Sequence, residues 1–308
     1  MCKKELIVLI AVVLGCVVLA KATMEDDLKA SQTFVATYNN GFDADYARGS
    51  GTATVHSNPL YSPAEQVQVG PDGSGAFPGA SPTNQALLHP HTGAQHDNTY
   101  TDIYVDYDGG GGNFSFSAGS YAAWSKWDYM KRGFTPAEGV IIQQNDYRWT
   151  PESLSLCNTY YYSYNLDFWL MGTDASSKTS WYATQQIPGT DAWVFTVATW
   201  QLIPDAGSTT GYRMDATMNV WNGVQWYKSG LASTMDVDPT FTPTKTYVGS
   251  AKTGWAGYGG YVDWVQIYDR PLSDVEITYL RDSTVEFIPE PATVALLGLG
   301  LLCIRRRK

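Results

Sequence analysis

Apolar and polar residues alternate one by one along several short stretches of this chain, and this pattern restricts the fold more than any other feature. Along residues 212–220 every second residue is apolar, and the residues between are Arg, Asp, Thr and Asn. Successive side chains of a β-strand point to opposite faces, so this stretch predicts a strand with one buried and one solvated face. Asn222 and Gly223 follow, a dipeptide that suits a tight hairpin, and Trp226 and Tyr227 begin the expected return strand.

Similar stretches recur along the chain between Gly, Pro, Asn and Asp residues, which favour turns. In residues 192–200, one parity collects Trp193, Phe195 and Val197 as the expected buried face. The further predicted strands are 33–38, 52–56, 103–107, 113–117, 140–144, 166–171, 246–249 and 261–268. Many short strands predict an all-β fold, an antiparallel β-sandwich of the jelly-roll type. Residues 57–98, rich in Pro, Gly and Ser, are expected to form long loops of the same domain.

Composition agrees with a folded β domain and excludes several other classes. Aromatic residues make up 14% and charged residues only 16% of the chain, against about 25% charged residues on average. Disordered chains and coiled coils have the opposite balance. There are 30 acidic and 20 basic residues, which argues against nucleic acid as a partner because phosphate binding needs clustered cations.

One short helix is predicted near the end of the domain. Ser273 and Glu276 have the spacing of a capping box, in which each side chain bonds the backbone of the other. Leu272 precedes the helix, and Ile277 and Leu280 are expected to face the domain.

The amino-terminal end reads as a secretory signal peptide over residues 1–22. Lys3 and Lys4 precede an apolar run, and Ala20 and Ala22 form a small-x-small cleavage site. An uncleaved membrane anchor and a lipoprotein signal are the alternatives. The apolar run is shorter than the about 20 residues that a membrane span needs, which favours cleavage after Ala22.

Three parts follow one another at the carboxyl end: a Pro-Glu-Pro motif, a hydrophobic stretch and a basic tail. They consist of Pro289, Glu290 and Pro291, then residues 292–304, then Arg305, Arg306, Arg307 and Lys308. As a helix, the hydrophobic stretch would reach only about 20 Å, against a hydrocarbon core of about 30 Å. It is therefore expected to be a marginal membrane stop, giving transient membrane association.

This three-part end over residues 288–308 resembles the PEP-CTERM sorting signal of certain Gram-negative bacteria. The resemblance implies recognition and processing by an exosortase. It also implies export to the cell envelope, the surface or an exopolysaccharide matrix, with membrane attachment before processing. The alternative is an ordinary tail anchor.

The two ends hold seven of the 20 cations and two of the 30 acids, so the body between them carries 13 cations and 28 anions. They also hold three of the four cysteines, which leaves Cys157 alone in the body. An exported domain with one cysteine forms no internal disulfide. Cys157 is expected to be a buried or half-buried thiol rather than a nucleophile.

Residues 257–277 read Gly-Tyr-Gly-Gly-Tyr-Val-Asp-Trp-Val-Gln-Ile-Tyr-Asp-Arg-Pro-Leu-Ser-Asp-Val-Glu-Ile. This segment resembles the closing signature of laminin-G-like domains in the concanavalin A-like lectin/glucanase superfamily. Residues 193–200 and 220–223 resemble earlier pieces of that pattern, and residues 38–51 its opening strand. The resemblance implies one domain over about residues 38–285. Trp264 departs from the pattern, because the family often has a second Asp there.

Since that superfamily contains glucanases, a glycoside hydrolase is the obvious enzyme hypothesis. Retaining hydrolysis requires two carboxyl groups about 5–5.5 Å apart. The glutamates of the body are scattered, and no closely spaced acidic pair stands out on one predicted strand. The sequence therefore favours a non-catalytic protein, with a hydrolase that uses aspartates as the alternative.

Two kinds of metal site suggest themselves. Asp263 shares strand parity with Val265, so it is expected to point toward the apolar layer, where a carboxylate needs a partner. The resemblance implies a structural Ca²⁺ near this strand and the opening strand, with Asp43 as the second ligand; bonding of Asp263 by turn amides is the alternative. His89, His91, His96 and Asp97 offer a Zn or Cu site, but their polar loop context favours surface histidines.

The many aromatic residues suggest stacking against sugar rings. Trp124, Trp127, Tyr161 and Tyr164 lie in the segments expected to be most exposed, whereas most tryptophans in alternating strands are expected to be core. Together these features predict an exported, non-catalytic, lectin-like protein with a structural or adhesive role and a polysaccharide partner.

Overall fold

The computed structural model describes residues 23–57, 59, 62–63, 66–71, 77, 84–89, 103–127, 138–144, 154–159, 165–171, 178–183, 192–208, 210–233, 240–250 and 259–283. Residues 23–31 are helical. The strands belong to one compact unit, Ser31–Thr284.

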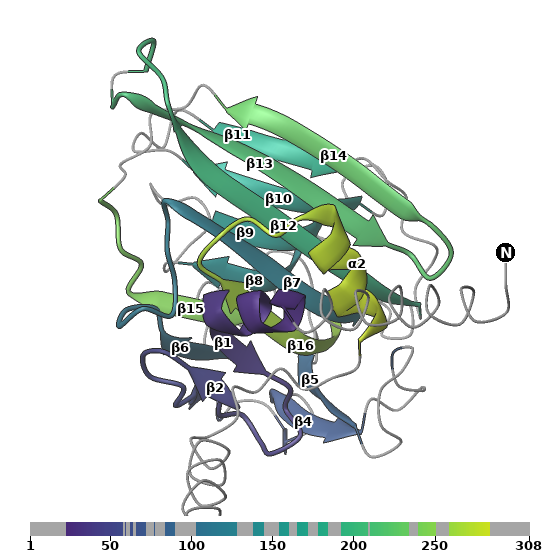
Figure 1. Cartoon of the computed structure of the whole chain (residues 1–308). Helices are drawn as coiled ribbons and strands as arrows, with labels where there is room; N and C mark the ends of the chain where they lie inside the picture. The colour runs from purple at the N-terminus through teal and green to yellow at the C-terminus, as the bar shows by residue number, and fades with distance from the viewer. Residues whose placement is uncertain are drawn as a thin grey trace, which may run out of the picture. The chain divides into compact units, whose positions relative to one another are not determined.

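The larger sheet of this unit has nine strands (Figure 1). They are β1 (Gln32–Ala36), β2 (Tyr46–Ala47), β4 (Gln68–Pro71), β5 (Gln85–His89), β7 (Ala118–Trp127), β12 (Trp193–Pro204), β13 (Tyr212–Trp221), β14 (Trp226–Ser233) and β16 (Gly260–Tyr268). The main order is β14-β13-β12-β7-β16-β1-β2. β5 pairs with the first residues of β16, ahead of β1, and carries β4 on its other side.

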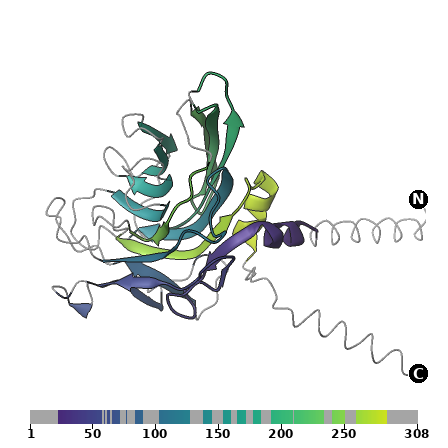
Figure 2. The same ribbon diagram turned by 90° about the vertical axis from the view of Figure 1, so that its left-hand side faces the viewer.

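The smaller sheet has seven strands in the order β11-β10-β9-β8-β15-β6-β3. They are β3 (Thr54–His56), β6 (Tyr104–Asp108), β8 (Glu138–Gln144), β9 (Leu154–Thr159), β10 (Asn165–Met171), β11 (Lys178–Ala183) and β15 (Lys245–Val248). Figure 2 shows its teal strands standing opposite the green strands of the larger sheet. The edge strands β11 and β14 contact each other. The prediction of an all-β antiparallel sandwich is confirmed.

Aromatic rings fill the space between the sheets. Trp200 of β12 lies 4.7 Å from Tyr121 of β7 and 5.9 Å from Phe168 of β10, measured between ring centroids. All three are fully buried, so this group links the two sheets. Gly119 makes room for it, because a Cβ atom there would lie 2.4 Å from the Trp200 ring.

Trp193, Phe195 and Val197 of β12 are buried as expected. The residues that join the core between the sheets are nevertheless of the other parity, such as Val194 and Trp200. Phe195 packs instead beside the rings of Trp124 and Trp226. Both faces of this strand are buried, so alternation of polarity cannot identify the inner one.

Other strand predictions also differ from the structure. Residues 113–117 form turns and coil rather than a strand. Their alternation arises because Phe114 and Phe116 enter the core from a loop. β7 was not predicted, because its small residues are buried on both faces and show no alternation. β4 and β5 lie within the stretch 57–98, which was expected to contain only loops.

The predicted helix is present as α2 (Asp274–Asp282), and its capping box is confirmed. The Ser273 hydroxyl accepts a hydrogen bond from the Glu276 amide, and the Glu276 carboxylate accepts one from the Ser273 amide at 2.8 Å. Arg270 donates to the same carboxylate at 2.5 and 3.1 Å.

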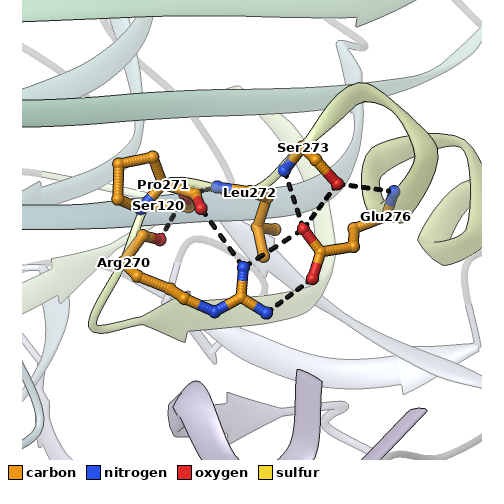
Figure 3. A network of polar contacts seen from close by, with 6 residues as sticks. All are labelled: Ser120, Arg270, Pro271, Leu272, Ser273 and Glu276. Carbon is orange, nitrogen blue, oxygen red and sulfur yellow. Dashed lines mark hydrogen bonds and ion pairs between the residues drawn. The ribbon is translucent and has the colours of Figure 1, made fainter. Parts of the chain in front are cut away.

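Ser120 of β7 connects this cap to the larger sheet (Figure 3). Its hydroxyl donates to the Arg270 carbonyl at 2.9 Å and accepts from the Leu272 amide at 3.0 Å. The start of α2 is therefore fixed to the centre of the sheet, and Ile277 and Leu280 are buried as predicted.

We expect Gly119→Ala to destabilise the protein by about 3 kcal/mol, because the added methyl group would overlap the Trp200 ring and the Tyr268 carbonyl. Urea unfolding measures the change. Gly70→Ala in β4 is the matched control: its Cβ meets nothing within 4 Å, so its stability should stay within about 0.5 kcal/mol of wild type. Equal losses in both variants would contradict the proposed packing.

The cap also makes the stability depend on pH. Burial alone would raise the pKa of Glu276, but the hydrogen bonds from Arg270 and Ser273 outweigh it and hold this pKa below the ordinary 4.5. A carboxylate whose pKa is lower in the folded state contributes stability above its ordinary pKa, and this contribution is lost as the pH falls.

We therefore expect Glu276→Gln to lower the free energy of unfolding by about 1.5 kcal/mol at neutral pH, and the difference from wild type to shrink in acid. Asp274→Asn is the control, because the Asp274 side chain is 70% exposed and its ion pair with Lys228 should contribute less than about 0.5 kcal/mol. Denaturant titrations at several pH values measure both. A difference that stays constant down to acid pH would refute the role of the charge.

Candidate functional site

Three ionisable side chains meet on the face of the smaller sheet that points away from the core. On β6, Asp106 lies on this outer face, because its chain neighbours Val105 and Tyr107 belong to the core. Asp106 of β6 is bonded by His56 from β3 and by Lys245 from β15. β3 and β15 flank β6 on either side, so the pairing of the strands brings the three side chains together.

Asp106 is the centre of this cluster. Its Oδ2 lies 2.7 Å from Nε2 of His56, and its Oδ1 accepts a hydrogen bond from Nζ of Lys245 at 2.6 Å. The His56 ring stacks on Tyr104, with centroids 4.0 Å apart and an interplanar angle of 21°. Tyr104 in turn contacts the Tyr247 ring edge to face at 5.6 Å. We call these five residues the His56 cluster.

Exposure differs sharply within the His56 cluster. The Asp106 side chain is 4% exposed, whereas those of His56 and Lys245 are 35% and 39% exposed. A buried carboxylate is stable only when its oxygens are bonded, and here each oxygen has a partner. Asp106 therefore holds a half-exposed imidazole and a half-exposed ammonium group in fixed positions at the surface. Such groups can stack on a ligand and donate hydrogen bonds to it.

Asp108 lies two residues beyond Asp106 on β6, so both acids lie on one face of the strand. This pair was not predicted, although the sequence shows the spacing Asp-Tyr-Asp at the end of the predicted strand 103–107. Asp108 is exposed, and its Oδ1 accepts from the Gly110 amide at 3.0 Å. His56 and Lys245 were not predicted either, because they are 50 and 139 residues from Asp106 along the chain.

Asp263, the first expected calcium ligand, is fully buried in β16. Asn84 donates to its Oδ2 at 2.5 Å, and the Trp264 amide donates to its Oδ1 at 2.7 Å. A β-bulge follows Asp263, and Trp264 has a φ of 51°. The bulge breaks the alternation between Asp263 and Val265, so their shared parity does not give the direction of Asp263.

Asp43, the second expected ligand, accepts a hydrogen bond from the Ala53 amide at 2.8 Å. Near Asp263, burial raises the pKa of the Tyr38 hydroxyl well above its ordinary value, so this hydroxyl stays neutral and adds no negative charge there. Within the described ranges, no three His, Cys, Asp or Glu side chains form a group that could hold a metal ion. Calcium binding by Asp263 and Asp43 stays a prediction.

The aromatic residues expected to bind sugar are only partly described. Trp124 is 2% exposed, and its ring stacks on Phe77 at 5.1 Å. The expectation that Trp124 is exposed is therefore wrong, because the outer face of β7 is itself covered. Trp127 is the last residue of β7, but its side chain is not among those that the structure describes. Tyr161 and Tyr164 lie outside the described residues.

His89 is buried in β5, and its Nε2 lies 3.0 Å from the Ile103 carbonyl. It is therefore not the surface histidine that was favoured. His91, His96 and Asp97 lie outside the described residues. Cys157 is placed in β9 opposite Val140, but its side chain is not described. The expected signal cleavage at Ala20 and Ala22 also lies outside the described residues.

Residues 287–308 match the PEP-CTERM protein-sorting motif. This match covers the predicted elements Pro289, Glu290, Pro291, Arg305, Arg306 and Arg307, and it confirms the sorting tail. The motif marks the chain as an exported protein that is processed at the cell envelope. Among the residues that the structure describes, no helix is both long and apolar enough to span a membrane.

Solved structures resemble the chain in fold. Domain 4 of AbnA, a GH43 extracellular arabinanase from Geobacillus stearothermophilus in complex with arabinotriose, matches with a TM-score of 0.51 and 13% identity over 82% of this chain and 100% of that chain. A mutant of HCR/D matches with a TM-score of 0.51 and 14% identity over 83% of this chain and 53% of that chain. The chain thus spans about half the length of HCR/D. At such low identity these matches show a shared fold alone. No curated protein matches the sequence.

A chelator tests the calcium prediction. If Ca²⁺ binds Asp263, removing it should lower the melting temperature of the wild-type protein and leave that of Asp263→Asn unchanged. Differential scanning calorimetry with Ca²⁺ and with chelator measures both. An unchanged melting temperature in the wild type would refute calcium binding and leave the Asn84 amide and the Trp264 N–H as the partners of this carboxylate.

Proposed function

We propose that the chain is an exported, non-catalytic, laminin-G-like protein of the cell surface or extracellular matrix, which binds polysaccharide through the His56 cluster. One observation carries this proposal: buried Asp106 holds a half-exposed imidazole on one carboxylate oxygen and a half-exposed ammonium group on the other, on the outer face of the smaller sheet. The sorting tail supports the proposed location, and an exosortase is the proposed processing enzyme.

The chemistry of the His56 cluster suits a carbohydrate. Sugar rings present C–H groups, which pack against flat rings, and hydroxyl oxygens, which accept hydrogen bonds. His56 offers an imidazole ring whose orientation is held by stacking on Tyr104. Lys245 offers ammonium N–H donors in addition to the one that is bonded to Asp106. Because Asp106 already orders the side chains of His56 and Lys245, the protein loses little side-chain entropy when a ligand binds.

The fold is compatible with this function, since the AbnA domain of similar fold was determined with arabinotriose. The likeness extends to fold only, so the residues of the His56 cluster support the proposal independently of it.

A secreted glycoside hydrolase is the second candidate, and the pair Asp106 and Asp108 on one strand face favours it. A glycosidase acid is usually a carboxyl group in apolar surroundings, whereas Asp106 lies between His56 and Lys245. This difference makes binding the better proposal. Release of reducing sugar by the wild-type protein, lost in Asp106→Asn, would establish the hydrolase instead.

We expect Lys245→Gln to weaken binding to matrix polysaccharides about tenfold, the loss typical of one charge-assisted hydrogen bond. A glycan array identifies the ligand, and titration calorimetry with that glycan measures the affinity. Lys228→Gln is the matched control, because Lys228 also pairs with an aspartate, Asp274, but on the larger sheet.

Binding that is unchanged in Lys245→Gln and in His56→Ala would show that the sugar site lies elsewhere on the protein. Binding that is lost equally in Lys228→Gln would indicate a nonspecific charge effect. The array is run with Ca²⁺ and with chelator, so that a calcium-dependent site is recognised separately.

A further inference from the structure

The turn between β13 and β14 differs from the rest of this acidic body. Residues 219–227 contain no charged residue and read Asn-Val-Trp-Asn-Gly-Val-Gln-Trp-Tyr. Val224 at the tip is 81% exposed. The half-buried rings of Trp221 and Trp226 lie behind it, with centroids 5.6 Å apart.

This hairpin tip has a fixed shape. The Asn222 side-chain oxygen accepts hydrogen bonds from the amides of Val224 and Gln225, each at 3.0 Å. Gly223 supplies the positive φ of 93° that the turn requires. A singly exposed valine is ordinary on a protein surface. Val224, however, lies on an ordered turn in front of two half-buried tryptophan rings and within an uncharged segment, and this combination points to a partner that covers it.

α2, the last helix that the structure describes, lies beside the strands that carry this tip. Arg281, in the last turn of α2, lies over the Trp221 ring at 4.2 Å and over Trp226 at 5.2 Å. α2 ends at Asp282, and the hydrophobic part of the sorting tail begins ten residues later, at residue 292. Ten extended residues span at most about 35 Å, so a membrane that holds the tail lies within reach of the hairpin tip.

We propose that the tip of the β13–β14 hairpin docks on the surface of the lipid bilayer that holds the sorting tail. Val224 enters the headgroup region, and Trp221 and Trp226 lie at the level where tryptophan rings prefer to reside. The absence of charge in residues 219–227 lets this face approach anionic lipids that repel the rest of the body. The proposal rests on the sorting motif and is independent of sugar binding.

Tryptophan fluorescence can test this in the full chain. Neither residues 1–22 nor residues 285–308 contain tryptophan. Quenching by brominated lipids therefore reports on the folded body and not on the inserted ends. With the full chain bound to vesicles of phosphatidylcholine and phosphatidylglycerol, we expect brominated lipids to quench part of the emission. Val224→Asp should abolish this quenching while flotation still finds the chain on the vesicles.

Val55→Asp is the matched control, because Val55 is also exposed, at 41%, but on β3 of the smaller sheet. It should keep the wild-type quenching. Absence of quenching in the vesicle-bound wild type, or equal quenching in Val224→Asp, would overturn the proposal. Association of the chain with itself in the absence of vesicles, lost in Val224→Asp, would assign the tip to a second copy and would overturn it as well.

Discussion

The close contact between β7 and β12 at Gly119 and Trp200 is the constraint on which the rest of the sandwich depends. The indole occupies the space where a side chain at residue 119 would stand, and from there it reaches Phe168 of the opposite sheet. The next two residues of β7 contact other parts of the fold. Ser120 fixes the start of α2, and Tyr121 fills the core beside Trp200. Three consecutive residues thus connect the two sheets and the helix.

Features set by near neighbours in the chain were predictable from sequence. The hairpin at Asn222 and the cap at Ser273 depend on residues within four positions, and both form as expected. The strand β7 depends on contacts on both of its faces, made by segments far away in sequence, so its own residues carry no alternation. The bulge at Trp264 is a similar case, because only its pairing with β7 reveals it.

The candidate site was less predictable than the fold for the same reason. Aromatic content drew attention to Trp124, but a tryptophan suits a core as well as a surface, and only the packing of Phe77 on Trp124 distinguishes the two. His56, Asp106 and Lys245 lie on three strands that become neighbours only through the sheet order. Of these, Asp106 alone carried a readable signal, its spacing from Asp108.

The distribution of charge connects the His56 cluster with the hairpin tip. The body carries 28 acids and 13 cations, so most of its surface repels anionic polymers and anionic lipids at short range. Described cations such as Arg270, Lys228 and Lys245 are paired with acids and neutralise charge only locally. An acidic matrix polysaccharide or a bilayer therefore meets least repulsion where an acid is neutralised by its partners, as at Asp106 between His56 and Lys245, or where charge is absent, as in residues 219–227. An acidic protein of this kind can keep its solubility and still have two places of contact, because each depends on local charge and not on the net charge.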